Sequence, residues 1–364
     1  MKNTAYILLH LFLFGGCTHY PSKNQGIETI DFNRVSTEPF SQVEKTGILT
    51  NPVYTPLYFS EEMYLSDIDI IKTYKGKFFI AEKRSRKLMV FDANGMPLSL
   101  VGMRGRGPGE YLNISDFDID DQGNIYLIDG TTDYLLIYNA DYKFIESIKL
   151  PFEVELIKCL NNGNFLLALC SWNSGAFEDD MLVVVDREFN VVESVAKYDK
   201  SLIDNNLRLS NDRFVESFGK IFFHQGNIDD HVYVMDQSGH LSQTVHFDFG
   251  SQKVPYEFRN DVEPYYESKT IHNYRLLRDF VIVNDRYALG TLWDKGITKC
   301  FLLTRGDRKM YEKPYIPLDN ASEYFINILD NKLVTLISTA NDPVDNHAEK
   351  ATWSDYRLCF YTLQ

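Results

Sequence analysis

The sequence predicts an all-β protein, a six-bladed β-propeller in which an N-terminal strand closes the last blade. Three observations lead to this fold class. One hairpin motif occurs six times, a second hairpin motif occurs five times between its copies, and the last repeat reaches the C-terminus one strand short. The chain has 364 residues, of which 44% are hydrophobic and 14% aromatic, so it can bury a substantial core.

The first motif is a short turn that leads into an apolar or alternating run, as in a tight hairpin. Its copies lie 40 to 66 residues apart, which suits four short strands in each repeat. The six copies are KGKFFIAE from Lys75, QGNIYLID from Gln122, NGNFLLAL from Asn162, FGKIFFHQ from Phe218, NDRYALGT from Asn284 and DNKLVTLI from Asp330.

The second motif is an apolar strand that ends in a polar turn and continues as a new strand. It lies between copies of the first motif, which makes it the hairpin of the third and fourth strands of each repeat. Its copies are FDANGMPL from Phe91, YNADYKFI from Tyr138, VDREFNVV from Val185, MDQSGHLS from Met235 and a degenerate LTRGDRKM from Leu303.

The sixth repeat lacks a fourth strand, because its third strand, YRLCFYTL from Tyr356, runs to the end of the chain at Gln364. The alternating segment GIETIDFNRV, residues 26–35, precedes the first repeat. We expect it to pair beside the last strand and close the ring, which would remove both exposed sheet edges. The alternative is an open pair of β-sandwiches, which the regular turn spacing and the missing strand disfavour.

The first residues predict a secretory signal that is separate from this fold. Lys2 precedes the apolar run 5–16, which is too short to cross a bilayer as a helix. The run ends in LFGGC and resembles a bacterial lipoprotein signal, which implies that Cys17 is lipidated and becomes the new N-terminus. The alternative is an ordinary signal peptide with a buried free thiol. The predicted division is a signal peptide at 1–16, a tether at 17–25 and the propeller at 26–364.

The residue after the lipidated position bears on location. Lipoproteins that stay on the inner membrane carry an aspartate there, whereas this chain has Thr18. The resemblance therefore implies the outer membrane of a Gram-negative cell, with the propeller facing the periplasm or the medium. The lipid would be the only contact with the membrane.

Charge and cysteine usage narrow the classes of partner and cofactor. Acidic residues outnumber basic ones by 51 to 37, for a formal net charge of −14, which argues against nucleic acid as a partner. The four cysteines after Cys17 show neither a CxxC pair nor a Cys/His pair at zinc spacing, and we expect them to be buried thiols. They are Cys159, Cys170, Cys300 and Cys359.

One stretch of the chain resembles a known family. The DANG turn, the segment GRGRGPGEY and the hairpin DIDDQGNIYLID follow one another as in the six-bladed propeller lipoproteins of Bacteroidota, which are relatives of NHL-repeat and TolB-like propellers. The match is sharpest over residues 67–139. The resemblance implies the fold and a place in the cell envelope, but it implies no reaction.

The segment GMRGRGPGEY, residues 102–111, lies between the outermost strand of the first blade and the innermost strand of the second. A chain that crosses from rim to hub needs positive φ angles and close backbone approach, which glycine permits. We therefore interpret it as an inter-blade crossing. In the alternative interpretation, Arg104 and Arg106 bind an anionic ligand. Glu110 would be a salt-bridge partner within the crossing.

In a propeller, the crossings and the loops from second to third strands share one face. All three tryptophans, Trp172, Trp293 and Trp353, fall in such loops, together with Arg84. Tryptophan stacks on sugars and anchors peptides. The predicted function is therefore a binding module for a glycan, peptide or protein partner at this face. Arg104, Arg106 and Glu110 would lie on the same face and contribute to the site. The alternative is that each tryptophan is a wedge between blades.

A second function, of another class, is a metal-assisted lyase or hydrolase similar to propeller lactonases, with a divalent cation at the hub. The weak ligand candidates, none of them at a diagnostic spacing, are Asp116, Asp118, His224, Asp230 and His231. Aspartates that alternate along a strand more often end or solvate it. No GxSxG or HExxH motif is present, and the binding module, which needs no cofactor, is the preferred prediction.

Overall fold

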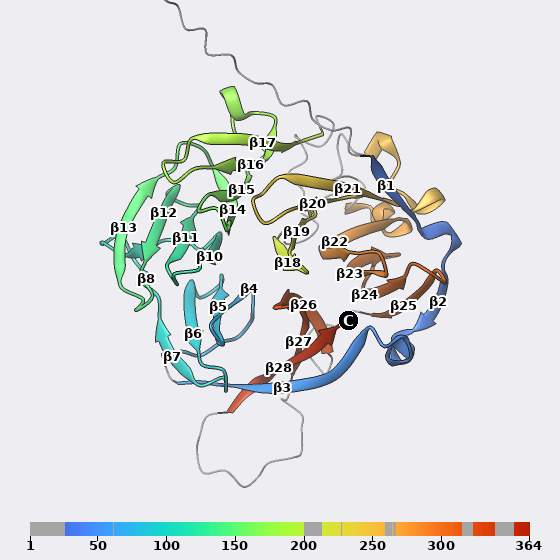
Figure 1. Ribbon diagram of the computed structural model, residues 1–364, viewed down its shortest axis with the longest axis horizontal. Coiled ribbons are helices and arrows are strands. Elements are labelled where there is room, and N and C mark those ends of the chain that lie inside the picture. The colour runs from blue at the N-terminus through green and yellow to red at the C-terminus, as the bar shows by residue number, and fades with distance from the viewer. Residues whose placement is uncertain are drawn as a thin grey trace, which may run out of the picture.

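The computed structural model describes residues 26–60, 62–199, 213–226, 228–258, 264, 267–314, 323–338 and 353–364. In this part of the chain, six sheets surround a central axis as the blades of a propeller (Figure 1). Each blade is an antiparallel sheet of four strands, and blades four and five carry a fifth strand. The predicted six-bladed β-propeller is therefore confirmed.

Each blade begins at the hub and ends at the rim. Blade one is β4 (Ile70–Tyr74), β5 (Lys77–Glu82), β6 (Lys87–Phe91) and β7 (Pro97–Leu100); blade two is β10 (Asp116–Ile119), β11 (Ile125–Asp129), β12 (Tyr134–Tyr138) and β13 (Phe144–Lys149); blade three is β14 (Val154–Cys159), β15 (Phe165–Leu169), β16 (Asp180–Val185) and β17 (Val191–Lys197). Blade four is β18 (Val215–Ser217), β19 (Lys220–Phe223), β20 (His231–Met235) and β21 (Leu241–Asp248); blade five is β22 (Arg275–Val283), β23 (Tyr287–Asp294), β24 (Ile297–Thr304) and β25 (Lys309–Pro314). Blade six is β26 (Glu323–Leu329), β27 (Lys332–Ser338), β28 (Trp353–Leu363) and β3 (Leu49–Tyr58).

The first hairpin motif is the connection from the innermost to the second strand of each blade. In blade one, Lys75 and Gly76 have φ angles of 47° and 76°. Positive φ at both central residues is the mark of a two-residue type I′ turn, whose twist matches that of the strands it joins. Blades four and six use the same pair of positive φ angles at residues 218–219 and 330–331.

The second hairpin motif depends on one side chain in each turn. In blade one, the Asp92 carboxylate accepts hydrogen bonds from the backbone N–H groups of Asn94 (2.8 Å) and Met96 (2.9 Å). The polar residue at the same place in blades two, three and four bonds to the backbone two and four residues on, in the same way. These short-range bonds explain why the turn is readable from the sequence. The degenerate copy in blade five has Thr304 at this place.

The hydrophobic core lies between neighbouring blades. Phe79 of blade one and Leu127 of blade two belong to one buried cluster, and Phe78 of blade one and Leu358 of blade six belong to another. Each blade thus buries its faces against two neighbours. The consequence is that the stability of every blade depends on the ring being closed.

The closing strand is not the predicted one. Residues 26–35 do not pair with the last blade; instead, β3 pairs antiparallel with β28 and completes blade six. The prediction missed β3 because Pro52 and Pro56 interrupt its strand pattern. Proline is tolerated there because β3 is the outermost strand, with one edge free of ladder bonds.

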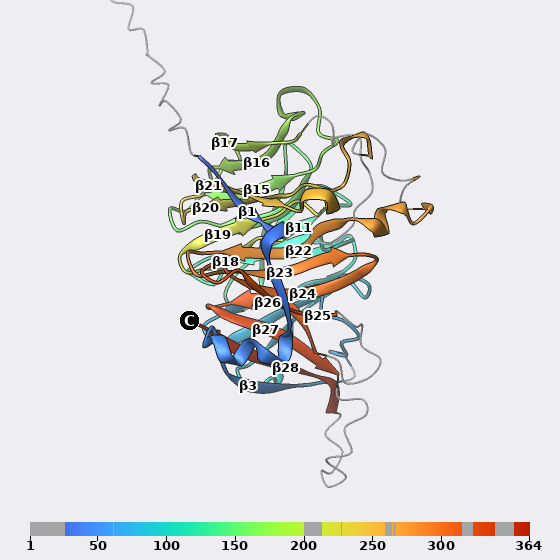
Figure 2. The same ribbon diagram turned by 90° about the vertical axis from the view of Figure 1, so that its right-hand side faces the viewer.

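The segment that was predicted to close the ring runs along the rim instead. β1 (Ile27–Asp31) pairs parallel with β21 of blade four, and β2 (Ser36–Pro39) pairs parallel with β25 of blade five. Figure 2 shows this segment in blue, passing along the outside of the blades before it becomes β3. Phe32, which lies between the two strands, packs against Phe249 with ring centroids 5.1 Å apart.

Three of the four predicted thiols, Cys170, Cys300 and Cys359, are buried, whereas Cys159 is half-buried, and none of the four forms a disulfide in the described part of the chain. Cys17 and the apolar run before it lie outside the described residues. Within the described part of the chain, no helix has the length and apolar character needed to span a membrane.

The contact between blade one and the closing strand can be tested at Gly95. A Cβ atom at this residue, whose φ is +77°, would lie 1.8 Å from the Pro56 carbonyl oxygen of β3. At the control position Gly163, also at positive φ, the nearest atom would be 4.0 Å away. We expect Gly163→Ala to cost about 1–2 kcal/mol of unfolding free energy, from backbone strain alone. Gly95→Ala should cost about 3 kcal/mol or more, because the closing strand must also move. Denaturant unfolding of both variants measures this, and equal losses would contradict the proposed docking.

Candidate functional site

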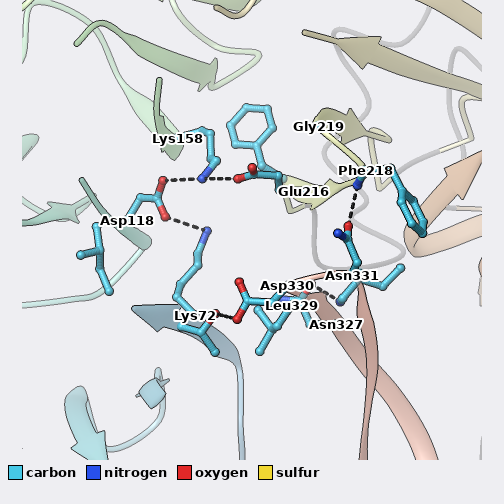
Figure 3. Close-up of a pocket in the computed structure, with 14 residues that line it drawn as sticks. Lys72, Asp118, Lys158, Glu216, Phe218, Gly219, Asn327, Leu329, Asp330 and Asn331 are labelled. Atoms are coloured by element: carbon cyan, nitrogen blue, oxygen red, sulfur yellow. Dashed lines mark hydrogen bonds and ion pairs between the residues drawn. The ribbon is translucent and has the colours of Figure 1, made fainter. Parts of the chain in front are cut away.

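A polar pocket of about 260 Å³, the hub pocket, lies on the propeller axis (Figure 3). It opens on the face that carries the first and second hairpin turns, called here the turn face. The innermost strands of five blades contribute side chains to it: Lys72 of β4, Asp118 of β10, Lys158 of β14, Glu216 of β18 and Asn327 of β26. Side chains far apart in the sequence therefore converge on one small volume.

Four of these side chains form a chain of alternating charge, called here the hub ladder. Lys72 Nζ lies 3.7 Å from Asp118 Oδ1, and Lys158 Nζ lies 3.2 Å from Asp118 Oδ2. Lys158 Nζ is also 3.0 Å from Glu216 Oε2. Figure 3 shows the ladder passing across blades one to four. Its two cations and two anions balance, so the pocket presents many polar groups without an excess of charge from the ladder.

Asp118 also has a structural role, which it shares with Asp116. The Asp116 carboxylate accepts a hydrogen bond from the Ile157 backbone N–H (3.0 Å), and the Asp118 carboxylate accepts one from that of Cys159 (2.8 Å). Both acceptors lie on β10 and both donors on β14. The two alternating aspartates thus fasten blade two to blade three, and they neither end nor solvate the strand.

The two aspartates differ in their electrostatics. Burial raises the pKa of Asp116 above its ordinary value. Burial acts in the same direction on Asp118, but the ammonium groups of Lys158 and Lys72 outweigh it and lower the pKa of that carboxyl. For Lys158, burial is outweighed by Asp118 and Glu216, which raise the pKa of the amine. At neutral pH Asp118 and Lys158 are therefore both charged.

The turn of blade six is tied directly to blade four. The Asn331 side-chain oxygen accepts hydrogen bonds from the Phe218 backbone N–H (2.6 Å) and from the Ser217 hydroxyl (3.3 Å). Arg213, just before β18, donates to the Ile326 carbonyl of β26. These contacts bring blades four and six together at the hub, and no residue of blade five lines the pocket.

Phe218 stands out at the pocket rim. Its side chain is 45% exposed, and its backbone φ is +50°. An exposed aromatic side chain gains little from burial, and a bulky residue at positive φ is strained. Such strain persists where surrounding structure enforces it, and it is concentrated at functional sites. Phe218 is among the residues that line the hub pocket.

The predicted tryptophan face is only partly described. Trp172 is 58% exposed, and its indole N–H donates to the Glu153 carboxylate. Trp293 lies at the end of β23 rather than in a loop; it is half-buried, with the Arg278 guanidinium 5.5 Å from the ring centroid. Trp353 begins β28, and its side chain lies outside the described part of the structure. Neither Trp172 nor Trp293 is among the described residues that line the hub pocket, and a ligand site on the tryptophan face stays a prediction.

The predicted inter-blade crossing is confirmed, since residues 102–111 connect β7 to β10. The Glu110 carboxylate accepts a hydrogen bond from the Gly107 backbone N–H (2.8 Å). A Cβ atom at Gly105 would lie 1.8 Å from the same carboxylate, so a side chain there would displace Glu110 from this position. Glu110 thus folds the crossing onto itself. Arg84, Arg104 and Arg106 are exposed, and their role as ligand contacts remains a prediction.

The metal candidates do not come together. Asp116 and Asp118 lie at the hub, whereas His224, Asp230 and His231 lie in blade four at the connection from β19 to β20. His231 Nδ1 is 2.7 Å from Asp229 Oδ1, which raises the pKa of the imidazole, and Asp230 pairs with Lys253 at 2.9 Å. Among the described residues, no group of three or more His, Cys, Asp or Glu side chains is arranged to hold a metal ion.

The sequence analysis missed most of the hub pocket. Lys72, Lys158 and Glu216 each occupy a polar position near the end of an otherwise mostly apolar innermost strand, just before the first hairpin turn. That shared position could have identified them, because the ends of innermost strands meet at the axis.

Comparisons with known proteins agree with this architecture. A family model described as "Domain of unknown function (DUF4934)" matches residues 29–351. The chain belongs to this family. No curated protein matches the chain.

Among solved structures, a "putative exported protein" of Bacteroides fragilis NCTC 9343 is similar with a TM-score of 0.74 and 19% identity, over 92% of this chain and 99% of that chain. A DUF4221 family member from Bacteroides vulgatus ATCC 8482 has a TM-score of 0.50 and 11% identity, over 87% and 97% of the two chains. The virginiamycin B lyase of Staphylococcus aureus is more distant, with a TM-score of 0.44 and 10% identity, over 86% of this chain and all of the lyase chain. The resemblance to six-bladed propellers of Bacteroidota is confirmed at the level of the fold.

The hub ladder can be tested with Asp118→Asn and its matched control Asp116→Asn. Both substitutions keep an oxygen that accepts the β14 backbone N–H, but only the first removes the carboxylate that pairs with both Lys72 and Lys158. We expect Asp118→Asn to lower the free energy of unfolding at pH 7 by about 3–5 kcal/mol. Asp116→Asn should be neutral within about 1 kcal/mol or stabilising, because it removes a charge that burial disfavours.

The two variants should also differ in pH dependence. Because the pKa of Asp118 is lower in the folded than in the unfolded state, the ionised carboxylate stabilises the fold above the unfolded-state pKa of about 4. This stabilisation is lost as the pH falls through the pKa that Asp118 has in the folded state. The deficit of Asp118→Asn should therefore shrink below about pH 4. The raised pKa of Asp116 has the opposite sign, so Asp116→Asn should improve relative to the natural protein between pH 4 and pH 7. Urea unfolding across this range measures both trends, and identical pH profiles would contradict the assigned roles.

Proposed function

We propose that this protein is a lipid-anchored binding module of the cell envelope and that the hub pocket is its ligand site. The observation that carries the proposal is the convergence of the hub ladder on a pocket rimmed by the exposed, strained Phe218. A concave site with a few placed polar groups is the usual form of a small-ligand site. At about 260 Å³, the hub pocket suits one end of a glycan, a peptide or a protein partner better than a large ligand.

The ladder favours binding over catalysis. A general base needs a pKa near the working pH, whereas the lysines lower that of Asp118. Glu216 is likewise held by Lys158, at 3.0 Å. The carboxylates of the ladder are thus arranged to hold lysines in place and to accept hydrogen bonds, which suits recognition of a polar ligand.

The location part of the proposal rests on the first residues and on the fold. The apolar run 5–16 and the lipoprotein-like LFGGC support a signal peptide at 1–16 and a lipid on Cys17. Residues 17–25 would then be a tether and 26–364 the propeller, on the outer membrane. The similarity to a Bacteroides fragilis protein described as exported supports an envelope location.

The path of β1 adds an orientation to this proposal. β1 is parallel to β21, which leaves the turn face, and Ile27 pairs with Thr244 partway along that strand, so β1 begins nearer the turn face than it ends. The tether would therefore reach the propeller on the side that carries the hub pocket. A tether of nine residues spans at most roughly 30 Å when extended. The hub pocket would accordingly face the anchoring membrane at short range.

The ligand site can be tested with Phe218→Asn. Asparagine tolerates positive φ, so the variant should keep the turn and gain up to about 1 kcal/mol of stability, but it removes the aromatic contact. The control is Lys295→Asn, an exposed residue at φ +52° on the opposite face. The probes are free amino acids, di- and tripeptides, and mono- and disaccharides at millimolar concentration, each assayed by its effect on the melting temperature.

At least one probe should raise the melting temperature of the natural protein and of Lys295→Asn, but not that of Phe218→Asn. A probe that stabilises all three proteins equally binds elsewhere. If no probe binds through Phe218, the hub pocket is not a ligand site.

The anchor can be tested with Cys17→Ser. Because acylation requires the cysteine thiol, this variant should take up no palmitate label and should leave the membrane fraction. Cys159→Ser serves as the control, since that thiol lies within the propeller, and it should stay labelled and membrane-bound. Membrane retention of Cys17→Ser would refute lipid anchoring at this residue.

A further inference from the structure

The hub pocket continues outward between blades six and one. A second cavity of about 270 Å³, called here the seam, shares Thr73, Leu329 and Asp330 with the hub pocket. It runs between β5 of blade one and the strands β28 and β3 of blade six. The two cavities are therefore neighbours, and Thr73 and Asp330, which lie between them, are called here the bend.

The chemistry of the seam differs from that of the hub. Phe78 and Phe360 stack within it, with ring centroids 5.6 Å apart, and Val53 of the closing strand is 62% exposed beside it. Ala93, in the second hairpin turn of blade one, lines the same cavity. Exposed apolar side chains around a concave site mark a place where an apolar group can be buried. A dry cavity of about 150 Å³ is enough for a benzene ring, so the seam has room for one leucine or phenylalanine side chain.

Asp330 supplies a negative charge at the bend. Its side chain is exposed and accepts a hydrogen bond from the Thr73 hydroxyl (3.1 Å). No cation among the described residues forms an ion pair with it. In Figure 3, the Asp330 carboxylate lies beside the Lys72 side chain, and Asp330 is next to Asn331. The site thus offers a carboxylate, an amine beside it and a neighbouring recess. The walls of the recess combine apolar side chains with Lys332, Thr55 and Thr362.

From this arrangement we infer that the hub pocket and the seam together bind the free amino end of a short peptide whose first residue is apolar. The inference rests on the proposed function of the hub pocket and names its ligand. The α-ammonium group pairs with Asp330, the first side chain enters the seam, and the first carbonyl faces Lys72. The remaining residues leave through the mouth of the hub pocket. A neutral glycan has neither the cation nor the apolar arm that this geometry matches.

The experiment measures the affinity of the full-length protein, purified in detergent, for three peptides by isothermal titration calorimetry. The peptides are Leu-Gly-Gly, its N-acetylated form, and Gly-Gly-Gly. We expect Leu-Gly-Gly to bind at least tenfold more tightly than either of the others. Acetylation removes the cation, and glycine leaves the seam empty.

Two variants separate the contributions of bend and seam. Asp330→Asn keeps a residue that tolerates the φ of +50° and can still accept the Thr73 hydrogen bond, but it removes the charge. It should weaken Leu-Gly-Gly at least tenfold. Ala93→Leu fills the seam from an exposed turn position and should weaken Leu-Gly-Gly at least tenfold, while it leaves Gly-Gly-Gly unchanged.

Each outcome has a distinct meaning. If Leu-Gly-Gly and Gly-Gly-Gly bind equally well and Ala93→Leu has no effect, the seam holds no side chain and the inference is wrong. If a saccharide binds through Phe218 while no peptide binds, the peptide inference is wrong and the proposed function stands. If neither peptides nor saccharides bind through Phe218, both are wrong.

Discussion

The pairing of β3 with β28 is the constraint on which the rest of the structure depends. Every hydrophobic cluster that joins neighbouring blades requires a closed ring, and this pair closes it. Closure also builds the candidate site. Val53 of β3 and Phe360 of β28 line the seam, and the last blade brings Asn331 to within hydrogen-bonding distance of blade four. A loss of closure would therefore remove the seam and one wall of the hub pocket together with the fold.

The hub ladder shows how a propeller can fill its axis with polar groups. Buried charges are costly unless each has a partner, and an apolar replacement of a buried ion pair is often as stable. Hydrophobic packing at the axis would close the channel, whereas the ladder keeps a polar opening of about 260 Å³. The same four side chains thus hold blades one to four in register and line the pocket. That double use is consistent with a site shaped for recognition, because its polar groups are oriented before any ligand arrives.

The N-terminal segment connects the fold to the proposed location. It adds a parallel strand to blade four and another to blade five before it closes blade six. Its first strand, β1, runs away from the turn face along blade four, which puts the proposed tether on the side of the hub pocket. The segment that completes the ring would therefore also present the pocket to the membrane. Fold stability, site geometry and orientation all depend on residues that precede the first repeat.

The sequence by itself determined the features that depend on nearby residues. The Asp92-type turns are held by hydrogen bonds to residues two and four positions on, and the type I′ turns need only two residues at positive φ, so both motifs and the count of six blades were predictable. The tertiary structure alone decided the closing strand, because Pro52 and Pro56 hide its pattern and only an outermost edge tolerates them. It also decided the site. Lys72, Asp118, Lys158 and Glu216 come one from each of four blades, and although each precedes the first hairpin turn of its blade, only the ring shows which of them form ion pairs. Asp116 and Asp118 were noticed in the sequence as weak metal candidates, yet the backbone and lysines that they bind belong to other blades. The role of a side chain at the hub depends on its neighbours from other blades, and these come together only in the closed ring.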